Sequence, residues 1–125
     1  TEKVTVAATA ATGTINYDTN TQSVVYYTSA AVGDWTINFR ASSGATLNSV
    51  IATGESITLV HLVTLTGAEY RNTTVQVDGS SITPEWQGGA APTEGNINSI
   101  DSYSYNIIKT GDAAFTILAA LTQFA

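Results

Sequence analysis

The sequence contains no cysteine, which excludes disulfides and thiolate metal sites as sources of its stability. Basic residues are also scarce, because four lysines and arginines stand against ten acidic residues and give a formal net charge of −6. Nucleic-acid binding depends on clustered positive charge, so no nucleic-acid partner is expected. The longest apolar runs, such as residues 59–63, are too short to span a bilayer, and no membrane insertion is expected.

Methionine is absent as well, and the first residues lead directly into a strand-like segment, so no secretory signal peptide is expected. We therefore expect residues 1–125 to form a single domain, the carboxyl-terminal part of a longer chain. Charged residues make up only 11% of the sequence, against about 25% in ordinary globular domains, whereas threonine occurs 21 times. Few charges and many small hydroxyl side chains favour packing against identical neighbours over a free monomer.

Short runs of alternating apolar and polar residues, rich in β-branched side chains, predict eight strands. They cover residues 4–8, 14–17, 23–28, 35–41, 56–64, 74–77, 103–109 and 114–121. Turn signals separate these runs, and Asp78-Gly79 suits a two-residue hairpin turn. The pattern predicts an all-β fold, namely an antiparallel, jelly-roll-like β-sandwich of about eight strands.

Two segments depart from the strand pattern. Residues 46–51 carry Leu47, Val50 and Ile51 at i, i+3 and i+4, which predicts one short helical turn in a connection. Residues 83–98 form the longest irregular stretch and contain both prolines and Trp86. A loop of this length in a compact domain is usually functional or a structural arm.

The alternation also assigns side chains to faces. Residues 35–40 place Trp35, Ile37 and Phe39 on one inward face, whereas residues 59–63 and 114–121 are apolar on both faces. A strand that is apolar on both faces is covered on both faces, so a neighbouring subunit is expected on the second one. The residues that we predict for this oligomer interface are Val60, His61, Leu62, Leu118 and Ala120.

His61 is the single histidine and lies among Ile57, Leu59 and Val63 on its face of the predicted strand. A structural histidine, buried or packed at an interface, is the favoured interpretation. The alternatives are a general base or a metal ligand, and in a trimer three copies of His61 could meet on the axis around an ion or water. Because no partner carboxylate lies nearby in the sequence, no metal site is expected.

Catalytic chemistry finds little support among the acidic residues. Four of them, Asp18, Asp34, Asp78 and Asp112, lie in predicted turns, where a carboxylate bonds the local backbone. Only Glu85 lies in a plausible site, and no nucleophile elbow or phosphate-binding glycine loop occurs. We expect no enzyme, no catalytic residue and no cofactor, and a small glycoside hydrolase or lyase acting through Glu85 remains a third alternative.

The long loop offers a second kind of site. Trp86, Gln87 and Tyr70 supply the stacking face and the hydrogen-bonding groups that a saccharide site uses. The competing interpretation is structural, in which Trp86 closes one end of the sandwich and Gln87 bonds loop backbone groups. Elsewhere, Asn72-Thr73-Thr74 fits the glycosylation pattern, which arises readily by chance in a chain rich in Thr and Asn.

Several segments of the sequence share motifs with a known protein family. They are residues 13–18 (GTINYD), 25–28 (VYYT), 35–40 (WTINFR), 77–80 (VDGS), 83–92 (TPEWQGGAAP), 103–111 (YSYNIIKTG), 115–119 (FTILA) and 122–124 (TQF). Together they resemble a module found in virion structural proteins of tailed bacteriophages, especially those of marine cyanobacteria. The resemblance spans nearly the whole chain, and residues 77–92 form its most specific block.

This resemblance implies a non-enzymatic building block, often the last domain of a fibre, baseplate or head-appendage protein, without catalytic residues or cofactor. It implies a location at the surface of the virion, with other virion proteins and further copies of the chain, commonly three, as partners. The sequence therefore favours a homotrimeric structural module. The alternative is a binding module that recognises a host surface glycan through the loop around Trp86.

Overall fold

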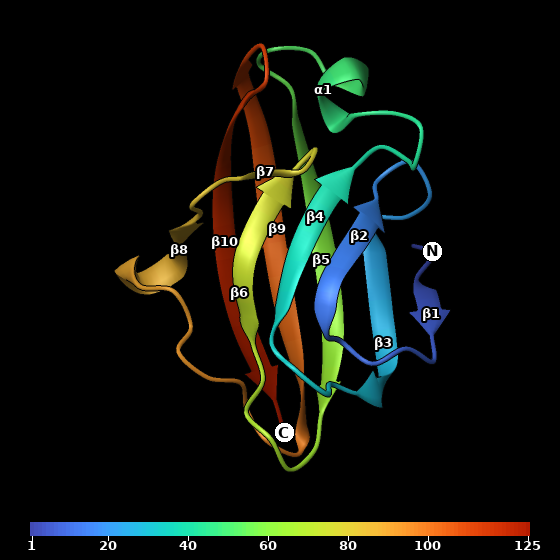
Figure 1. The fold of residues 1–125 in the computed structure, drawn as a ribbon, viewed down its shortest axis with the longest axis vertical. Helices are drawn as coiled ribbons and strands as arrows, with labels where there is room; N and C mark the ends of the chain where they lie inside the picture. Colours follow the sequence, from blue (N-terminus) through green and yellow to red (C-terminus); the bar gives the residue numbers. More distant parts are fainter.

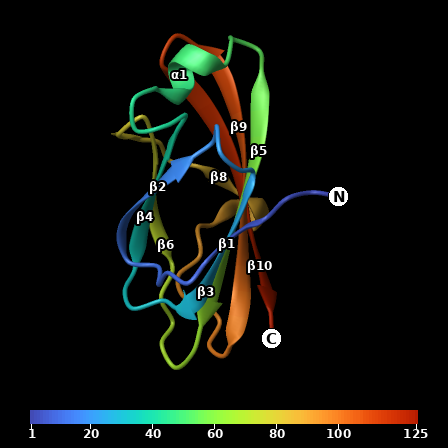
Figure 2. The ribbon, with the colours of Figure 1, turned by 90° about the vertical axis from the view of Figure 1, so that its right-hand side faces the viewer.

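The computed structural model describes residues 1–125. Its elements are β1 (Thr5–Ala7), β2 (Gly13–Asp18), β3 (Val24–Ala30), β4 (Trp35–Arg40), α1 (Leu47–Val50), β5 (Ser56–Leu65), β6 (Asn72–Val77), β7 (Ser80–Ser81), β8 (Glu85–Trp86), the 3-10 turn η1 (Gln87–Gly89), β9 (Ser99–Gly111) and β10 (Ala114–Phe124). The strands form two sheets that face each other across one core (Figures 1 and 2). The expected all-β sandwich is confirmed, as is each of the eight expected strands.

The strand directions differ from the expected antiparallel, jelly-roll-like arrangement, because both sheets are mixed. The six-stranded sheet has the order β1-β3-β5-β9-β10-β8, and the four-stranded sheet has the order β2-β4-β6-β7. From β1 to β6 the chain alternates between the sheets, so each connection crosses the sandwich and successive strands of one sheet run parallel. Only the pairs β5–β9, β9–β10 and β6–β7 are antiparallel.

The core lies between the sheets and contains 19 apolar side chains. Trp35, Ile37 and Phe39 of β4 are fully buried in it, as their alternation predicted. Tyr103 and Tyr105 of β9 stack at 6.3 Å, and Trp35 and Phe39 each meet one of these rings at a steep angle. Large aromatic side chains thus fill the centre of a small domain that lacks disulfides.

The predicted helical turn is present as α1 and is held at both ends. Thr46 caps its N-terminus by accepting a hydrogen bond from the Ser49 amide, and the Asp78 carboxylate accepts from the amides of the first two helical residues. At the other end, the buried Lys109 ammonium donates to the carbonyls of Asn48 and Ile51. No helix in the structure has the length and apolar character needed to cross a membrane.

Candidate functional site

The predicted binding loop is attached to the six-stranded sheet through β8, which pairs in parallel with β10. Trp86 lies opposite Ala119, whose side chain faces the core, so the pairing turns the indole inward. Directly afterwards, Gly88 and Gly89 have φ values of 81° and 85°, a conformation that residues with a Cβ rarely adopt. These two glycines reverse the chain and bring the rest of the loop back over the edge of the sheet.

Trp86 extends the aromatic cluster of the core toward this edge. Its ring centroid lies 6.4 Å from that of Tyr103 and 6.3 Å from that of Tyr105, with the ring planes steeply inclined. Such edge-to-face contacts add to the gain from burying the indole. Trp86 therefore anchors the loop, in agreement with the structural interpretation of this residue.

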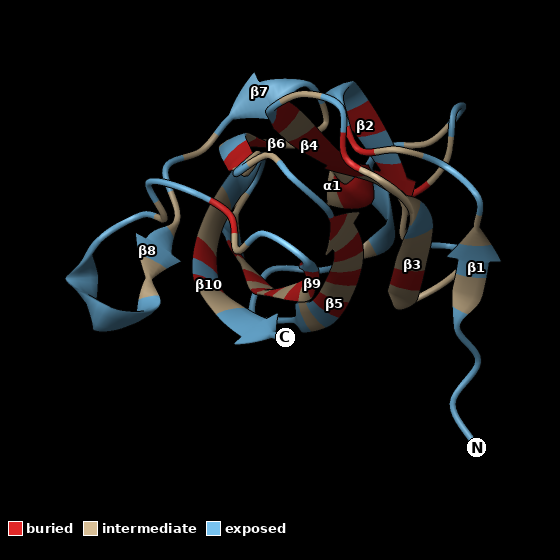
Figure 3. Ribbon diagram, turned by 90° about the horizontal axis from the view of Figure 1, so that it is seen from below, coloured by how far each residue is buried: buried red, intermediate tan, exposed pale blue.

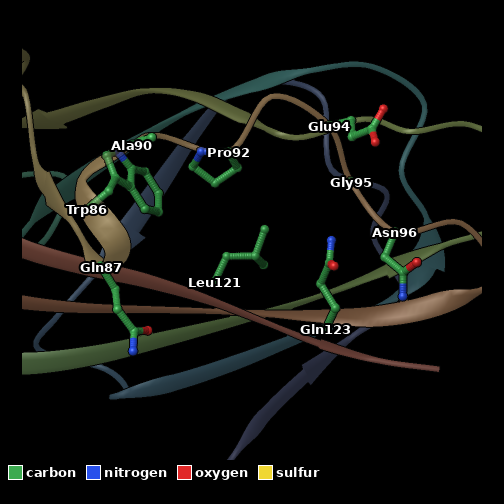
Figure 4. Close-up of a pocket in the computed structure, with 9 residues that line it drawn as sticks. All are labelled: Trp86, Gln87, Ala90, Pro92, Glu94, Gly95, Asn96, Leu121 and Gln123. Carbon is green, nitrogen blue, oxygen red and sulfur yellow. The ribbon is translucent and has the colours of Figure 1, made fainter.

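One side of the anchored indole forms the wall of a surface cavity of about 360 Å³ (Figure 4). The loop supplies one side of the cavity and β10 supplies the other. Its lining residues are Trp86, Gln87, Ala90, Pro92, Glu94, Gly95, Asn96, Leu121 and Gln123. Apolar groups at Trp86, Pro92 and Leu121 thus lie among amide and carboxylate groups, a mixture found in small-molecule sites. We call this cavity the loop pocket.

Sequence reasoning found two lining residues of the loop pocket, Trp86 and Gln87, and missed most of its polar groups. Glu94 and Asn96 come from the irregular end of the loop, where no periodicity marks them. Gln123 shares the inward parity of Leu121 but lies two residues beyond the predicted strand 114–121, which the structure extends to Phe124. Next to the pocket, a hydrogen bond with Glu94 and repulsion between the two carboxylates raise the pKa of the exposed Glu69.

Tyr70, the third predicted binding residue, does not line the loop pocket. It lies in the connection between β5 and β6, half-buried against the core. Its carbonyl oxygen lies so close to Gly95 that a side chain at that position would collide with it. Tyr70 therefore supports the pocket wall from behind, through its backbone.

Four of the five predicted interface residues point away from the core on the six-stranded sheet. Val24 of β3, Val60 of β5, Ser104 of β9 and Ala120 of β10 form one row in register across this sheet. Every outward side chain on β1, β3, β5, β9 and β10 is uncharged. We call this surface the outer face; it consists of Val6, Val24, Tyr26, Thr28, Ser56, Thr58, Val60, Leu62, Thr64, Ile100, Ser102, Ser104, Asn106, Ile108, Thr110, Thr116, Leu118, Ala120, Thr122 and Phe124.

His61 does not belong to the outer face, so its assignment to the interface is wrong. The residue is adjacent to Val60 and Leu62, and the period of two places it on the opposite side of β5. Its side chain is fully buried, with its ring centroid 4.7 Å from that of Tyr27 and 6.1 Å from that of Trp35. A histidine in the core also cannot meet its symmetry mates on a threefold axis outside the sheet.

Burial makes His61 a neutral residue. Desolvation lowers its pKa from 6.5 to about 4, because the core disfavours the charged imidazolium. Neither ring nitrogen has a hydrogen-bond partner in the protein, and the same holds for the indole nitrogen of Trp35. No group of three or more His, Cys, Asp or Glu side chains is arranged to hold a metal ion.

Other buried polar groups have clear structural partners. The Tyr105 hydroxyl donates to Asn72 Oδ1 at 3.0 Å, and the Asn72 side-chain amide donates to the carbonyls of Trp35 and Thr74. Asn72 is only 2% exposed, so the glycosylation pattern that it begins falls on a core residue. Asp101 accepts hydrogen bonds from the Asn96 amide and the Ser99 hydroxyl, and burial raises its pKa.

The four aspartates of the predicted turns do not bond the local backbone, contrary to the sequence prediction; each bonds a residue that lies at least 22 positions away in the chain. Asp18 pairs with Arg40 at 2.6 Å, Asp34 accepts from the Arg71 amide at 3.0 Å, and Asp112 accepts from the Asn48 side chain at 3.0 Å. Asp78 accepts from the backbone of α1. Glu85 is exposed on β8, opposite Leu118. It does not line the loop pocket; it lines a separate surface cavity on another side of Trp86. Each turn carboxylate is therefore engaged in holding the fold together.

Comparison of the chain with known protein families, curated proteins and solved structures finds no match.

Proposed function

We propose that this domain is a non-enzymatic building block of a bacteriophage virion, which associates with itself through the outer face as a homotrimer. Its location would be the particle surface, in contact with other virion proteins. The phage assignment rests on the sequence motifs described above. The self-association has independent support in the chemistry of the outer face.

The observation that best supports self-association is the lack of charged side chains on the outer face. None of the outward side chains of β1, β3, β5, β9 and β10 is charged, although the protein has a net charge of −6. On this side of the six-stranded sheet, the carboxylate of Glu85 lies at the edge, on β8 opposite Leu118. At the same time Val6, Leu118 and Phe124 are 63%, 48% and 57% exposed there. Charge depletion and exposed apolar side chains are features of interface cores rather than of free surfaces.

A direct test replaces Leu118, at the centre of β10, with a charged residue. In sedimentation at micromolar concentration the wild-type chain should have three times the 13.0 kDa mass of the monomer. Leu118→Asp should sediment as a folded monomer, because burying the new carboxylate costs more than the interface gains. Val50→Asp is the matched control, since Val50 is 47% exposed but lies on α1, and this variant should keep the wild-type mass. A monomeric wild type would refute self-association.

A second candidate function, recognition of a host surface glycan, is favoured by the loop pocket. Its mixture of an indole, a proline ring and side-chain amides suits a sugar, which offers apolar C–H faces and hydroxyl groups together. The pocket lies at the opposite edge of the sandwich from β1, on a loop fixed to the core by Trp86. A rigid scaffold beneath the site lowers the entropy that binding must overcome.

Glycan-array binding with amide variants separates this candidate from the first. Gln87→Ala and Gln123→Ala remove pocket amides that have no hydrogen-bond partner in the protein, so the fold should survive and glycan binding should fall about tenfold for each. Gln76→Ala on β6 is the control, since it removes a similar amide from the other sheet. Equal glycan binding by all three variants and the wild type would exclude the loop pocket.

A further inference from the structure

The six-stranded sheet has one long edge that the rest of the protein leaves largely unpaired. Strand β10 pairs with β9 along its whole length, whereas on its other side β8 pairs only with Leu118 and Ala119. Beyond these two residues, the backbone of residues 120–124 makes no hydrogen bond outside the ladder with β9. The last three residues of β10 are also exposed (Figure 3). We call this part of β10 the free edge.

The backbone groups of the free edge that lack a partner belong to Leu121 and Gln123. In β9, the N–H and the carbonyl of Lys109 both bond the connection before β5. Odd-numbered residues of β9 therefore face β5 and even-numbered ones face β10, because backbone groups alternate in direction along an antiparallel ladder. Thr122 is paired with an even-numbered residue and bonds β9. Its neighbours Leu121 and Gln123 therefore direct their N–H and C=O groups away from the sheet.

The free edge lacks the features that usually keep an exposed strand from pairing with another chain. Such strands commonly carry charged residues, proline or a bulge. Strand β10 contains no charged residue and no proline, and its one register shift lies at Ala114/Phe115, far from the free edge. The loop between η1 and β9 passes beside the free edge, but no hydrogen bond joins this loop to residues 120–124. An extended chain can therefore add to β10 here.

The loop pocket lies beside the free edge and would receive side chains of an added strand. Leu121 and Gln123 point into the pocket from β10 (Figure 4). Trp86 and Pro92 lie at the end of the pocket near Leu121, whereas Glu94 lies toward the end near Gln123. These two ends are two residues apart along β10, a spacing of about 7 Å. Side chains i and i+2 of an added strand would face one end each.

Charge decides which strand fits. Glu94 is the one charged residue that lines the loop pocket, and the neighbouring carboxylate of Glu69 repels it. A basic side chain beside Glu94 would offset this repulsion in a protein whose net charge is −6. The free edge of a second copy would instead bring a second pair of carboxylates against the first. The strand that fits therefore comes from a different protein and carries an apolar and a basic residue at i and i+2.

We propose that the free edge and the loop pocket together form a docking site for an extended segment of another protein, which adds as a strand beside Leu121 and Gln123. Main-chain hydrogen bonds supply affinity in this mode of recognition, and pockets for alternate side chains supply specificity. The docking site lies on a different side of β10 from the outer face, so it does not depend on self-association. It shares the loop pocket with the candidate glycan site, and the experiments below distinguish the two.

Amide hydrogen exchange measured by NMR tests the pairing on the unmodified protein. The probes are the acetylated and amidated peptide TTVTKTT and its reverse TTKTVTT, which covers the other strand direction, each at millimolar concentration. One of them should slow exchange at Leu121 and Gln123 about tenfold, whereas the Thr122 amide, already bonded to β9, should change little. The control peptide TTVKTTT places valine and lysine on opposite faces and should bind about threefold more weakly.

Two results of this measurement would overturn the docking site. Neither TTVTKTT nor TTKTVTT protects the amides of Leu121 and Gln123 in the first. In the second, both amides are protected without peptide, increasingly so at higher protein concentration, which would show that a second copy occupies the free edge.

Substitutions separate main-chain pairing from glycan recognition. Gln123→Pro removes an N–H without a partner in the protein, so the fold should survive and peptide affinity should fall about tenfold. Gln123→Ala keeps this N–H and should bind the peptide about fivefold more tightly than Gln123→Pro, although it removes the amide that a glycan would use. Glu94→Gln should weaken TTVTKTT about threefold more than TTVTQTT. Equal peptide affinity of the wild type and a folded Gln123→Pro would refute pairing at the free edge.

Discussion

His61 carries a proton in the unfolded chain at mildly acidic pH but remains neutral in the core. Its pKa is 6.5 in the reference state and about 4 in the fold, because burial disfavours the imidazolium. Between these two values the unfolded state binds more protons than the folded state. Stability must therefore fall as the pH decreases from about 7 toward 4.

We expect this one residue to remove about 3 kcal/mol from the free energy of unfolding over that range. The measurement is urea denaturation at several pH values for the wild type and for His61→Phe, which cannot titrate. Asp101, whose raised pKa acts in the opposite sense, is present in both proteins, so the difference between the curves isolates His61. Parallel curves would mean that His61 is solvated in the fold.

Asn38 is a residue whose role the sequence pattern could not reveal. The alternation correctly places it on the side of β4 opposite Phe39, which suggests a neutral surface position. In the structure its side chain is only 9% exposed: it donates to Asn16 Oδ1 at 3.0 Å and accepts from the Gly79 amide at 2.8 Å. These partners lie 22 and 41 residues away in the chain, so the local alternation of apolar and polar residues could not predict them.

Asn38→Ala should cost about 1–2 kcal/mol, because it breaks both hydrogen bonds and leaves the Gly79 amide without its protein acceptor. Gln76→Ala is the matched control, since Gln76 is the register neighbour of Asn38 on β6 and makes no comparable bond. Urea midpoints compare the two variants. Equal midpoints would show that the Asn38 bonds contribute nothing net.

At the scale of elements, local patterns predicted which segments form strands, and they did not predict how the strands run. Alternation and turn residues are local, so β4 and β10 were recognisable from their own residues. Whether a turn leads to the adjacent strand or across to the other sheet depends on packing partners far away. The signals at residues 18–20 and 32–34 proved to mark crossings between the sheets rather than hairpins. The parallel pairs followed from those crossings.

The hairpin between β6 and β7 is the element whose geometry the sequence predicted most fully. Asp78 and Gly79 have φ values of 52° and 84°, as a two-residue turn with both central residues left-handed requires. No atom lies within 4 Å of where a Cβ at Gly79 would sit, so Gly79→Val should cost only the backbone strain, about 1–2 kcal/mol. Gly44→Val, equally open but without a positive φ, should leave the melting temperature nearly unchanged. Similar losses in both would contradict a strain origin.

At the scale of the whole molecule, the candidate sites divide according to how far apart their residues lie in the sequence. Two strands of the outer face, β5 and β10, were recognisable from the sequence because they are apolar on both sides. Only the structure shows that Leu118 and Val60 point outward whereas His61 points into the core. The loop pocket combines residues from distant segments, such as Trp86 with Gln123. No spacing of residues in the sequence predicts such long-range contacts.

The separation of charge from the outer face predicts how self-association responds to salt. Each molecule carries a net charge of −6, so approaching copies repel one another, while the proposed interface contains no ion pair that salt would weaken. Added NaCl shortens the Debye length from about 30 Å at 0.01 M to about 10 Å at 0.1 M, and so screens the repulsion. It leaves the apolar contacts of Val60, Leu62 and Leu118 intact. Sedimentation at these two ionic strengths should therefore show tighter association at the higher one, and Leu118→Asp should remain monomeric at both. Weaker association with added salt would require attractive charge pairs between copies, which would place the interface on another surface of the molecule.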